Sequence, residues 1–208
     1  MIIKMVKLKF FILISIIGII KLYAQNYKIK NGIFLKFEDF KNNAPIPVEK
    51  IFFEKKSGIF LIDNVLENEK FKYKNDSDQF IEFYTGNIWG LYENGNIYVR
   101  RNKSFYKITY PGRISFFIGR VQTMISDYYN AYPSNQRTLV NNEYRQFLLD
   151  FETGEFLEFN EKNVEKLLSR DSLLYNEFKS LSKKQKKQLK FYYIRRYNEK
   201  YPLPFELE

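Results

Sequence analysis

Strand-like and turn-like segments alternate along residues 88–118. Branched and aromatic residues suited to a pleated, half-buried surface form four short runs. The Asn94-Gly95 pair tolerates positive φ in a tight hairpin turn, and Pro111-Gly112 marks another turn. The predicted strands cover residues 88–92, 97–101, 105–110 and 114–118. Three successive hairpins predict an antiparallel meander, and this pattern identifies no substrate and no reaction.

Weaker strand patterns flank the meander on both sides. Residues 37–42 allow one helical turn, which Pro45 and Pro47 prevent from continuing, because proline lacks an amide donor and restricts the residue before it. Glycine at position 154 supplies the positive φ needed in a hairpin turn of residues 152–155. The additional predicted strands are residues 27–35, 48–55, 58–62, 70–73, 80–84, 144–150 and 156–160.

The chain ends in three predicted helices. Asn160 caps a helix over residues 161–170, and Asp171 caps another over 172–181. Ser182 and Gln185 form a capping box for a third helix that runs to about residue 200. Apolar residues at helical spacing predict the buried faces of these helices. The stripes are Leu174, Phe178 and Leu181, and then Leu189, Tyr193, Tyr197 and Tyr201.

Strand signals and helix signals occupy separate parts of the chain. This separation predicts an α+β fold, an antiparallel β-meander sheet with helices segregated at the C-terminus. Residues 25–160 form the β body, and residues 161–208 form a helical segment packed on the same domain. The predicted core residues are Trp89, Leu91, Ile97, Val99, Phe105, Ile108, Phe116, Leu149 and Phe156.

Residues 1–24 have the order of a secretory signal peptide. Lysines at positions 4, 7 and 9 precede an apolar run over residues 10–20, and Ala24 supplies a small residue at the cleavage point. The apolar run is short for the ~20 residues that cross a bilayer, which favours cleavage over an uncleaved anchor. The mature protein is therefore expected in the periplasm, at the outer surface or in the medium, with no later transmembrane segment.

The composition excludes much chemistry. The chain contains no Cys and no His, so it has no disulfide, no thiolate or imidazole metal ligand and no Ser-His-Asp triad. An enzyme would have to use carboxylates, as in hydrolysis of an envelope glycan. We expect no cofactor and favour a non-catalytic binding or structural module, with a carboxylate-dependent hydrolase as the alternative.

Two segments offer further candidate sites. Pairing Phe151 with Phe156 would place Asp150, Glu152 and Glu155 on one face, where their oxygens suit a hard cation such as calcium, although a charged hairpin tip is commonly just solvated. A tyrosine-rich segment over residues 121–142 is expected to be irregular. It would either line a carbohydrate or peptide site or pack as a surface loop. We expect no metal ligand.

Basic residues are concentrated near the C-terminus. The chain has a net charge of +10, and nine Lys or Arg face one Glu between residues 179 and 200. A helix with one basic face and one apolar stripe is typical of contact with an anionic surface. The candidate contact residues are Lys183, Lys184, Lys186, Lys187, Lys190, Arg195 and Arg196. The alternative is a docked helix whose lysines are simply hydrated, and nucleic acid is not an expected partner.

Several segments resemble an uncharacterised family of exported proteins from Bacteroidetes bacteria. The similarity covers most of the mature chain and is carried by GIFLKFEDFKNNAP (residues 32–45), WG (89–90), ENGNIYV (93–99) and RRYNEKYP (195–202). The resemblance implies an envelope or secreted location. It implies no activity and transfers no functional residue.

Export gives the first testable prediction. Protein isolated from its own cells should have the intact mass of a chain that begins at Gln25, because the signal peptidase removes the apolar segment. A mass that still includes Met1 would contradict the prediction.

Overall fold

The computed structural model describes residues 28–56, 58–126 and 138–207, in two compact units. In the smaller unit, a short parallel bridge joins Lys28 to Glu206, and the Ile29 amide donates to the Glu206 carbonyl at 3.0 Å. The side chains of Ile29 and Phe205 are buried. The larger unit, residues 30–203, contains the sheets and helices described below.

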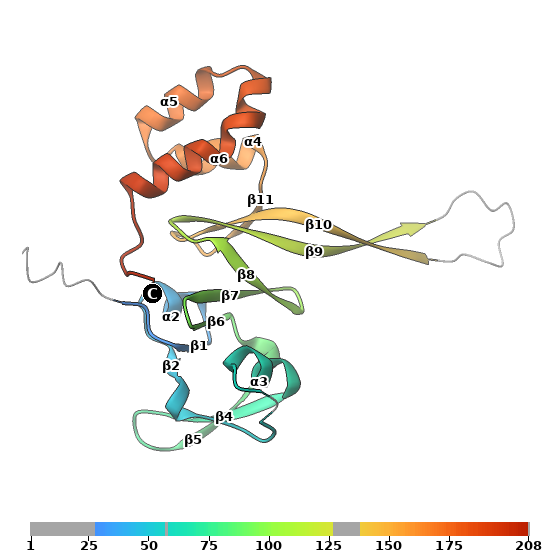
Figure 1. Ribbon diagram of the computed structural model, residues 1–208, viewed down its shortest axis with the longest axis vertical. Coiled ribbons are helices and arrows are strands. Elements are labelled where there is room, and N and C mark those ends of the chain that lie inside the picture. Colours follow the sequence, from blue (N-terminus) through green and yellow to red (C-terminus); the bar gives the residue numbers. More distant parts are fainter. Residues whose placement is uncertain (1–27, 57, 127–137, 208) are drawn as a thin grey trace, which may run out of the picture. The chain divides into compact units, whose positions relative to one another are not determined.

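The larger of the two sheets in this unit is antiparallel and has eight strands (Figure 1). Its spatial order is β11-β10-β9-β8-β7-β6-β1-β2. The strands are β1 (Gly32–Phe34), β2 (Ile46–Pro47), β6 (Gly90–Glu93), β7 (Asn96–Arg101), β8 (Ser104–Tyr110), β9 (Ile114–Ser126), β10 (Thr138–Asp150) and β11 (Phe156–Glu158). The run from β6 to β9 confirms the predicted meander. Asn94 and Gly95 have φ of 49° and 76°, as the tight turn between β6 and β7 requires.

A second sheet contains three antiparallel strands in the order β3-β4-β5. These are β3 (Ile51–Phe53), β4 (Lys70–Lys74) and β5 (Phe80–Tyr84). The N-terminal half also contains the helices α2 (Phe37–Lys41) and α3 (Leu61–Glu67) and the 3-10 turns Val48–Lys50 and Thr85–Asn87. Cluster residues Leu61 and Val65 of α3 pack with Phe71 of β4 and Leu91 of β6.

Three helices follow the last strand and confirm the predicted α+β class. They are α4 (Glu161–Leu168), α5 (Ser172–Ser180) and α6 (Lys183–Lys200). Each begins at its predicted cap: Asn160 accepts a hydrogen bond from the Asn163 amide, Asp171 accepts from Leu174, and Ser182 forms a capping box with Gln185. The helical boundaries are therefore encoded locally.

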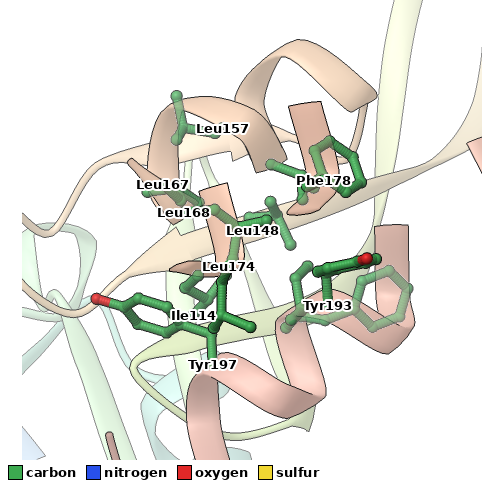
Figure 2. Packing of buried hydrophobic residues seen from close by; sticks show 12 residues of the cluster. Ile114, Leu148, Leu157, Leu167, Leu168, Leu174, Phe178, Tyr193 and Tyr197 are labelled. Atoms are coloured by element: carbon green, nitrogen blue, oxygen red, sulfur yellow. The ribbon is translucent and has the colours of Figure 1, made fainter. Parts of the chain in front are cut away.

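The C-terminal helices and the strands β9, β10 and β11 enclose one apolar core (Figure 2). Ile114 of β9 and Leu148 of β10 belong to the same cluster as residues of all three helices, among them Leu168, Phe178 and Ile194. Of the nine predicted core residues, six are buried. Trp89, Phe105 and Phe156 are only partly buried; Phe105 packs against the core cluster that contains Leu91, and Trp89 stacks on the buried Phe40 ring.

The buried face of α6 confirms the predicted stripe at Tyr193 and Tyr197, and Tyr201 packs against the same cluster, but the prediction was wrong for Leu189. Leu189 is 36 % exposed, whereas Tyr193, Ile194, Tyr197 and Asn198 are buried. The Asn198 side chain donates to the Ile114 carbonyl and accepts from the Ile114 amide, both at 2.9 Å. These two hydrogen bonds hold α6 against the start of β9 and set its rotation.

Two predicted segments take a different structure. Residues 58–62 were expected as a strand, but α3 begins at Leu61. The carboxylate of Glu93 accepts from the Leu61 amide at 2.6 Å and stabilises the positive end of this helix. The expected irregular segment at 121–142 is wrong in its outer parts, because β9 and β10 pair through residues 126 and 138. The tyrosines at 128, 129 and 132 lie outside the described residues.

Candidate functional site

Helix α6 carries all seven basic residues predicted to contact an anionic surface. The rotation fixed by Asn198 divides them into two groups, because part of the predicted basic face turns towards the protein. The inward group is Lys186, Lys190 and Arg196. The outward group is Lys183, Lys184, Lys187 and Arg195.

The inward residues form ion pairs and hydrogen bonds with α4, with α5 and with Phe159. Lys186 Nζ lies 2.8 Å from Glu165 Oε2 of α4. Lys190 donates to the Phe159 carbonyl at 2.9 Å, and its ammonium lies 4.2 Å from the centre of the Phe159 ring. Arg196 pairs with the Glu177 carboxylate of α5, and its hydrogen bond lowers the pKa of Glu177 below the ordinary range. These three cations hold helices together.

The outward group faces solvent. Lys183, Lys184 and Lys187 are exposed, and none of them forms an ion pair with any residue that the structure describes. Arg195 is also exposed, with its guanidinium 4.0 Å from the Glu199 carboxylate one turn later. The first turn of α6 contains no acidic residue. Three uncompensated charges therefore add to the positive end of the helix dipole.

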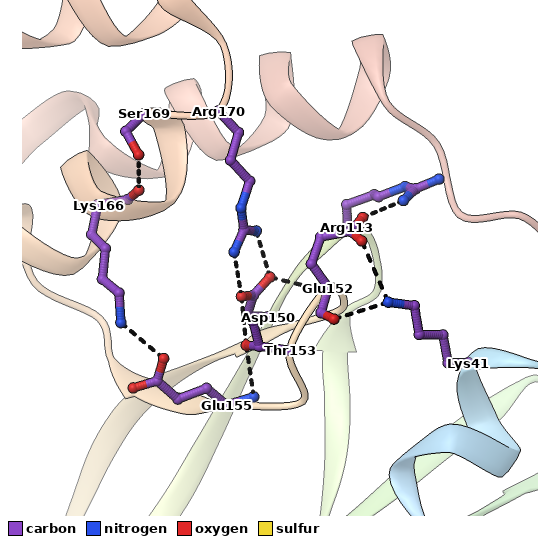
Figure 3. Close-up of polar contacts among 9 residues, drawn as sticks. All are labelled: Lys41, Arg113, Asp150, Glu152, Thr153, Glu155, Lys166, Ser169 and Arg170. Atoms are coloured by element: carbon purple, nitrogen blue, oxygen red, sulfur yellow. Dashed lines mark hydrogen bonds and ion pairs between the residues drawn. The ribbon is translucent and has the colours of Figure 1, made fainter.

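The carboxylates of the β10–β11 hairpin have a structural role instead of a shared ligand (Figure 3). The observed register pairs Leu149 with Phe156, so the predicted pairing of Phe151 with Phe156 was wrong. Residues 151–155 form the loop, and Gly154 has the predicted positive φ of 75°. The turn is two residues longer on the β10 side than expected, which points the three carboxylates at different partners.

Asp150 is the most enclosed of these carboxylates, with its side chain 2 % exposed. It accepts two hydrogen bonds from Arg170, both at 2.6 Å, one from the Thr153 hydroxyl at 2.7 Å and one from the Glu152 amide at 3.1 Å. Burial opposes ionisation, but these donors outweigh it and hold the pKa of Asp150 below its ordinary value. Asp150 is therefore a fixed anion at neutral pH.

The other two carboxylates bind separate cations. Glu152 pairs with Arg113, and Lys41 Nζ of α2 lies 3.5 Å from its second oxygen. Burial again opposes ionisation, and Arg113 outweighs it, so the pKa of Glu152 is lowered. Glu155 pairs with Lys166 of α4 at 2.8 Å. Within the described ranges, no group of three or more acidic residues is arranged to hold a metal ion.

The ionised state of Asp150 and Glu152 argues against a hydrolase that uses these carboxylates. A glycoside hydrolase needs one carboxylic acid that keeps its proton near neutral pH, which requires a raised pKa. Asp150 and Glu152 have lowered pKa values. These two carboxylates are therefore unsuited to the role of the general acid in such a mechanism.

A further exposed surface was not recognised as a site from sequence. Residues 70–74 read Lys-Phe-Lys-Tyr-Lys, a strict alternation that puts three lysines on one face of β4. The register places Phe80, Glu82 and Tyr84 of β5 on that same face. The alternation was visible in the sequence, but the pairing that joins the two strands was not.

Comparisons with known proteins found no relative. No family model matches the chain, and no similar curated protein or solved structure was found. Among the described residues, none of the helices combines the length and the apolar character needed to cross a membrane.

The Asp150–Arg170 pair predicts a pH-dependent contribution to stability. Replacement Asp150→Asn should lower the free energy of unfolding at neutral pH by about 1–3 kcal/mol, because Arg170 loses its charged partner. An Asp with a depressed folded pKa contributes fully above the unfolded value of about 3.9 and loses its contribution as pH falls through the folded pKa. The difference between wild type and variant should thus be constant above about pH 5 and shrink below about pH 4.

Urea unfolding at several pH values measures this difference. Asp76→Asn is the matched control, because Asp76 forms an ion pair with Lys50 while its side chain is fully exposed. A difference for Asp150→Asn that stays constant down to the lowest pH would contradict an ionised, hydrogen-bonded Asp150.

Proposed function

We propose that this protein is an exported, non-catalytic binding module of the cell envelope that contacts an anionic surface through the first two turns of α6. The proposal is carried by one observation. Lys183, Lys184 and Lys187 are exposed at the positive end of a helix without an ion-pair partner among the described residues. The ligand chemistry that suits them is phosphate, in lipid headgroups or in lipopolysaccharide.

The electrostatics of the helix start favour such a partner. Lysines near a helix N-terminus oppose the macrodipole, and like charges at three- and four-residue spacing repel each other. Both effects raise the free energy of the isolated protein slightly. An anionic surface relieves them, and each lysine close to such a surface contributes roughly 1 kcal/mol. Three lysines and Arg195 together are sufficient for reversible, salt-sensitive binding.

The inward cations support presentation of this surface. Lys186 and Arg196 bind carboxylates of α4 and α5, and Asn198 fixes the other end of α6 to β9. The helix start is therefore held by contacts that do not use the outward lysines. Binding and folding depend on separate sets of residues.

Co-sedimentation with vesicles tests the proposal. The mature protein should sediment with vesicles that contain anionic phospholipid at low salt and stay in solution with neutral vesicles, since the attraction is screened by ions. The variant Lys183→Gln, Lys184→Gln, Lys187→Gln should lose most of this binding and keep its thermal stability. Adding purified lipopolysaccharide as a competitor distinguishes the two phosphate sources.

The charge-matched control replaces three exposed lysines elsewhere, Lys55→Gln, Lys103→Gln and Lys107→Gln. This control should bind as the wild type does. Absence of low-salt binding, or equal losses in both triple variants, would show that α6 is only a hydrated face.

A further inference from the structure

The outer face of the three-stranded sheet is open and carries alternating rings and lysines. Lys70, Lys72 and Lys74 of β4 pair with Tyr84, Glu82 and Phe80 of β5, and Phe52 of β3 pairs with Lys72. Cross-strand partners share a face, so all of these side chains lie together. The opposite face, with Phe71, packs into the core beside α3.

The aromatic rings on this face are exposed to solvent. Phe52, Phe80 and Tyr84 are 45 %, 59 % and 47 % exposed. The Phe52 and Phe80 rings meet edge to face at 5.3 Å. The ammonium of Lys70 lies 4.5 Å from the centre of the Tyr84 ring, and that of Lys74 lies 5.6 Å from the centre of the Phe80 ring. Two of the three lysines of the central strand, Lys70 and Lys74, thus lie over rings of β5.

Strand β5 is also a free edge. It pairs with β4 alone in the sheet order. The Thr85 amide donates to Glu69, and the Asn75 amide donates to Gln79, so the odd-numbered positions of β5 form the hydrogen-bonded pairs with β4. The backbone N–H and C=O groups of Phe80, Glu82 and Tyr84 therefore point away from the sheet. The Tyr84 carbonyl belongs to the 3-10 turn Thr85–Asn87, which Tyr84 caps. For the backbone groups of Phe80 and Glu82, no strand other than β4 lies alongside among the described residues.

This edge lacks the features that usually block strand addition. Residues 80–84 read Phe-Ile-Glu-Phe-Tyr, with no proline and one charge. Such an apolar edge pairs readily with another strand. We propose that β5 binds an extended acidic peptide segment of a partner protein as an added antiparallel or parallel strand.

The basic groups of this face favour an acidic partner. The paired positions carry three lysines and Glu82, and Glu54 lines the groove beside Lys70 and Lys72, so these five groups leave an excess of one positive charge. Lys70 already pairs with Glu82 at 2.7 Å, and Lys74 lies 3.3 Å from Asp78 at the strand end. Lys72 has no ion pair with a described residue. Acidic side chains on an added strand would lie beside Phe80 and Tyr84, within reach of the lysines above those rings.

A second copy of this chain fits the edge less well. Symmetric pairing of two β5 strands about Glu82 would set two glutamates directly opposite each other, which is destabilising. Other registers would bring together two faces with the same positive excess. The isolated protein should therefore be monomeric through this edge, and the partner should supply the negative charge.

The probe is an alternating Glu-Val octapeptide with blocked ends, added to isotope-labelled mature protein and followed by NMR. The backbone amides of Phe80, Glu82 and Tyr84 should shift, and their hydrogen exchange should slow. Two N-methylated versions of the peptide, added to the unmodified protein, test whether the peptide binds as an added strand. Methylation at alternate positions should abolish binding for one parity and leave it for the other, because only every second amide of an added strand faces β5.

Charge variants provide the second readout. Lys72→Gln with Lys74→Gln should weaken peptide binding by roughly fivefold to tenfold, the effect of two exposed charge contacts. Lys103→Gln with Lys107→Gln is the matched control on the other sheet and should bind normally. A Lys-Val octapeptide should not bind.

Three results would overturn the proposal. Undetectable binding of the Glu-Val peptide at millimolar concentration is one. Equal binding of both N-methylated peptides is the second contradictory result, because it would show that the peptide binds as a polyanion across the face without strand pairing. Such a polyanion would lie in the open groove of about 390 Å³ that Phe52, Lys70, Lys72 and Glu82 help to line. The third is a concentration-dependent dimer that protects the β5 amides without peptide.

Discussion

Two hydrogen bonds between the Asn198 side chain and the backbone of Ile114 fix helix α6 on the sheet, and the arrangement of the basic residues follows from them. Ile114 and Asn198 are both buried, so each of these polar groups would cost free energy if left without its partner. Gly112 provides the space: a Cβ there would lie 2.1 Å from Asn198 Nδ2. Tyr193, Ile194 and Tyr197 complete the contact as apolar neighbours in the helical core.

The rotation of α6 separates structural from available charge. Lys186, Lys190 and Arg196 turn inward to groups on α4, α5 and the chain before them, while Lys183, Lys184 and Lys187 turn outward. The carboxylates of the β10–β11 hairpin show the same principle. Arg170, Arg113 and Lys166 each bind one of them and join the hairpin to the β8–β9 turn and to the helices. Most of the charged groups in these two regions are therefore structural, and the outward lysines of α6 are the ones left available to a ligand.

The features predictable from sequence are those encoded by neighbouring residues. The caps at Asn160, Asp171 and Ser182 and the turn at Asn94-Gly95 depend on side chains within three positions, and all are confirmed. The errors arise where a distant partner decides. The Glu93 carboxylate, 32 positions away, accepts from the first amide of α3, and Asn198 reaches across 84 positions to bind Ile114. Leu189 is the member of the predicted α6 stripe that is left exposed. A helical wheel contains neither contact.

The candidate sites also combine features that neighbouring residues encode with features that distant partners decide. Sequence identified the basic stretch of α6, but the contacts that remove Lys186, Lys190 and Arg196 from the surface come from other helices and from Phe159. The face of β4 and β5 required the register between Lys70 and Tyr84, which residues in the connecting loop set through Asn75 and Gln79. Alternation alone identifies a strand face and not the neighbouring strand.

The most direct test of this account is equilibrium unfolding in urea followed by two signals. Trp89 is the single tryptophan of the chain and stacks on Phe40 in the β body, and far-ultraviolet circular dichroism reports on the helices. We expect coincident transitions, and Asn198→Ala should move both together by about 2–4 kcal/mol, because two buried hydrogen bonds are lost from one cooperative unit. Asn176→Ala, at an exposed position of α5, should change neither. Loss of the helical signal at lower urea, with the Trp89 transition unchanged, would contradict the central role of the Asn198–Ile114 contact.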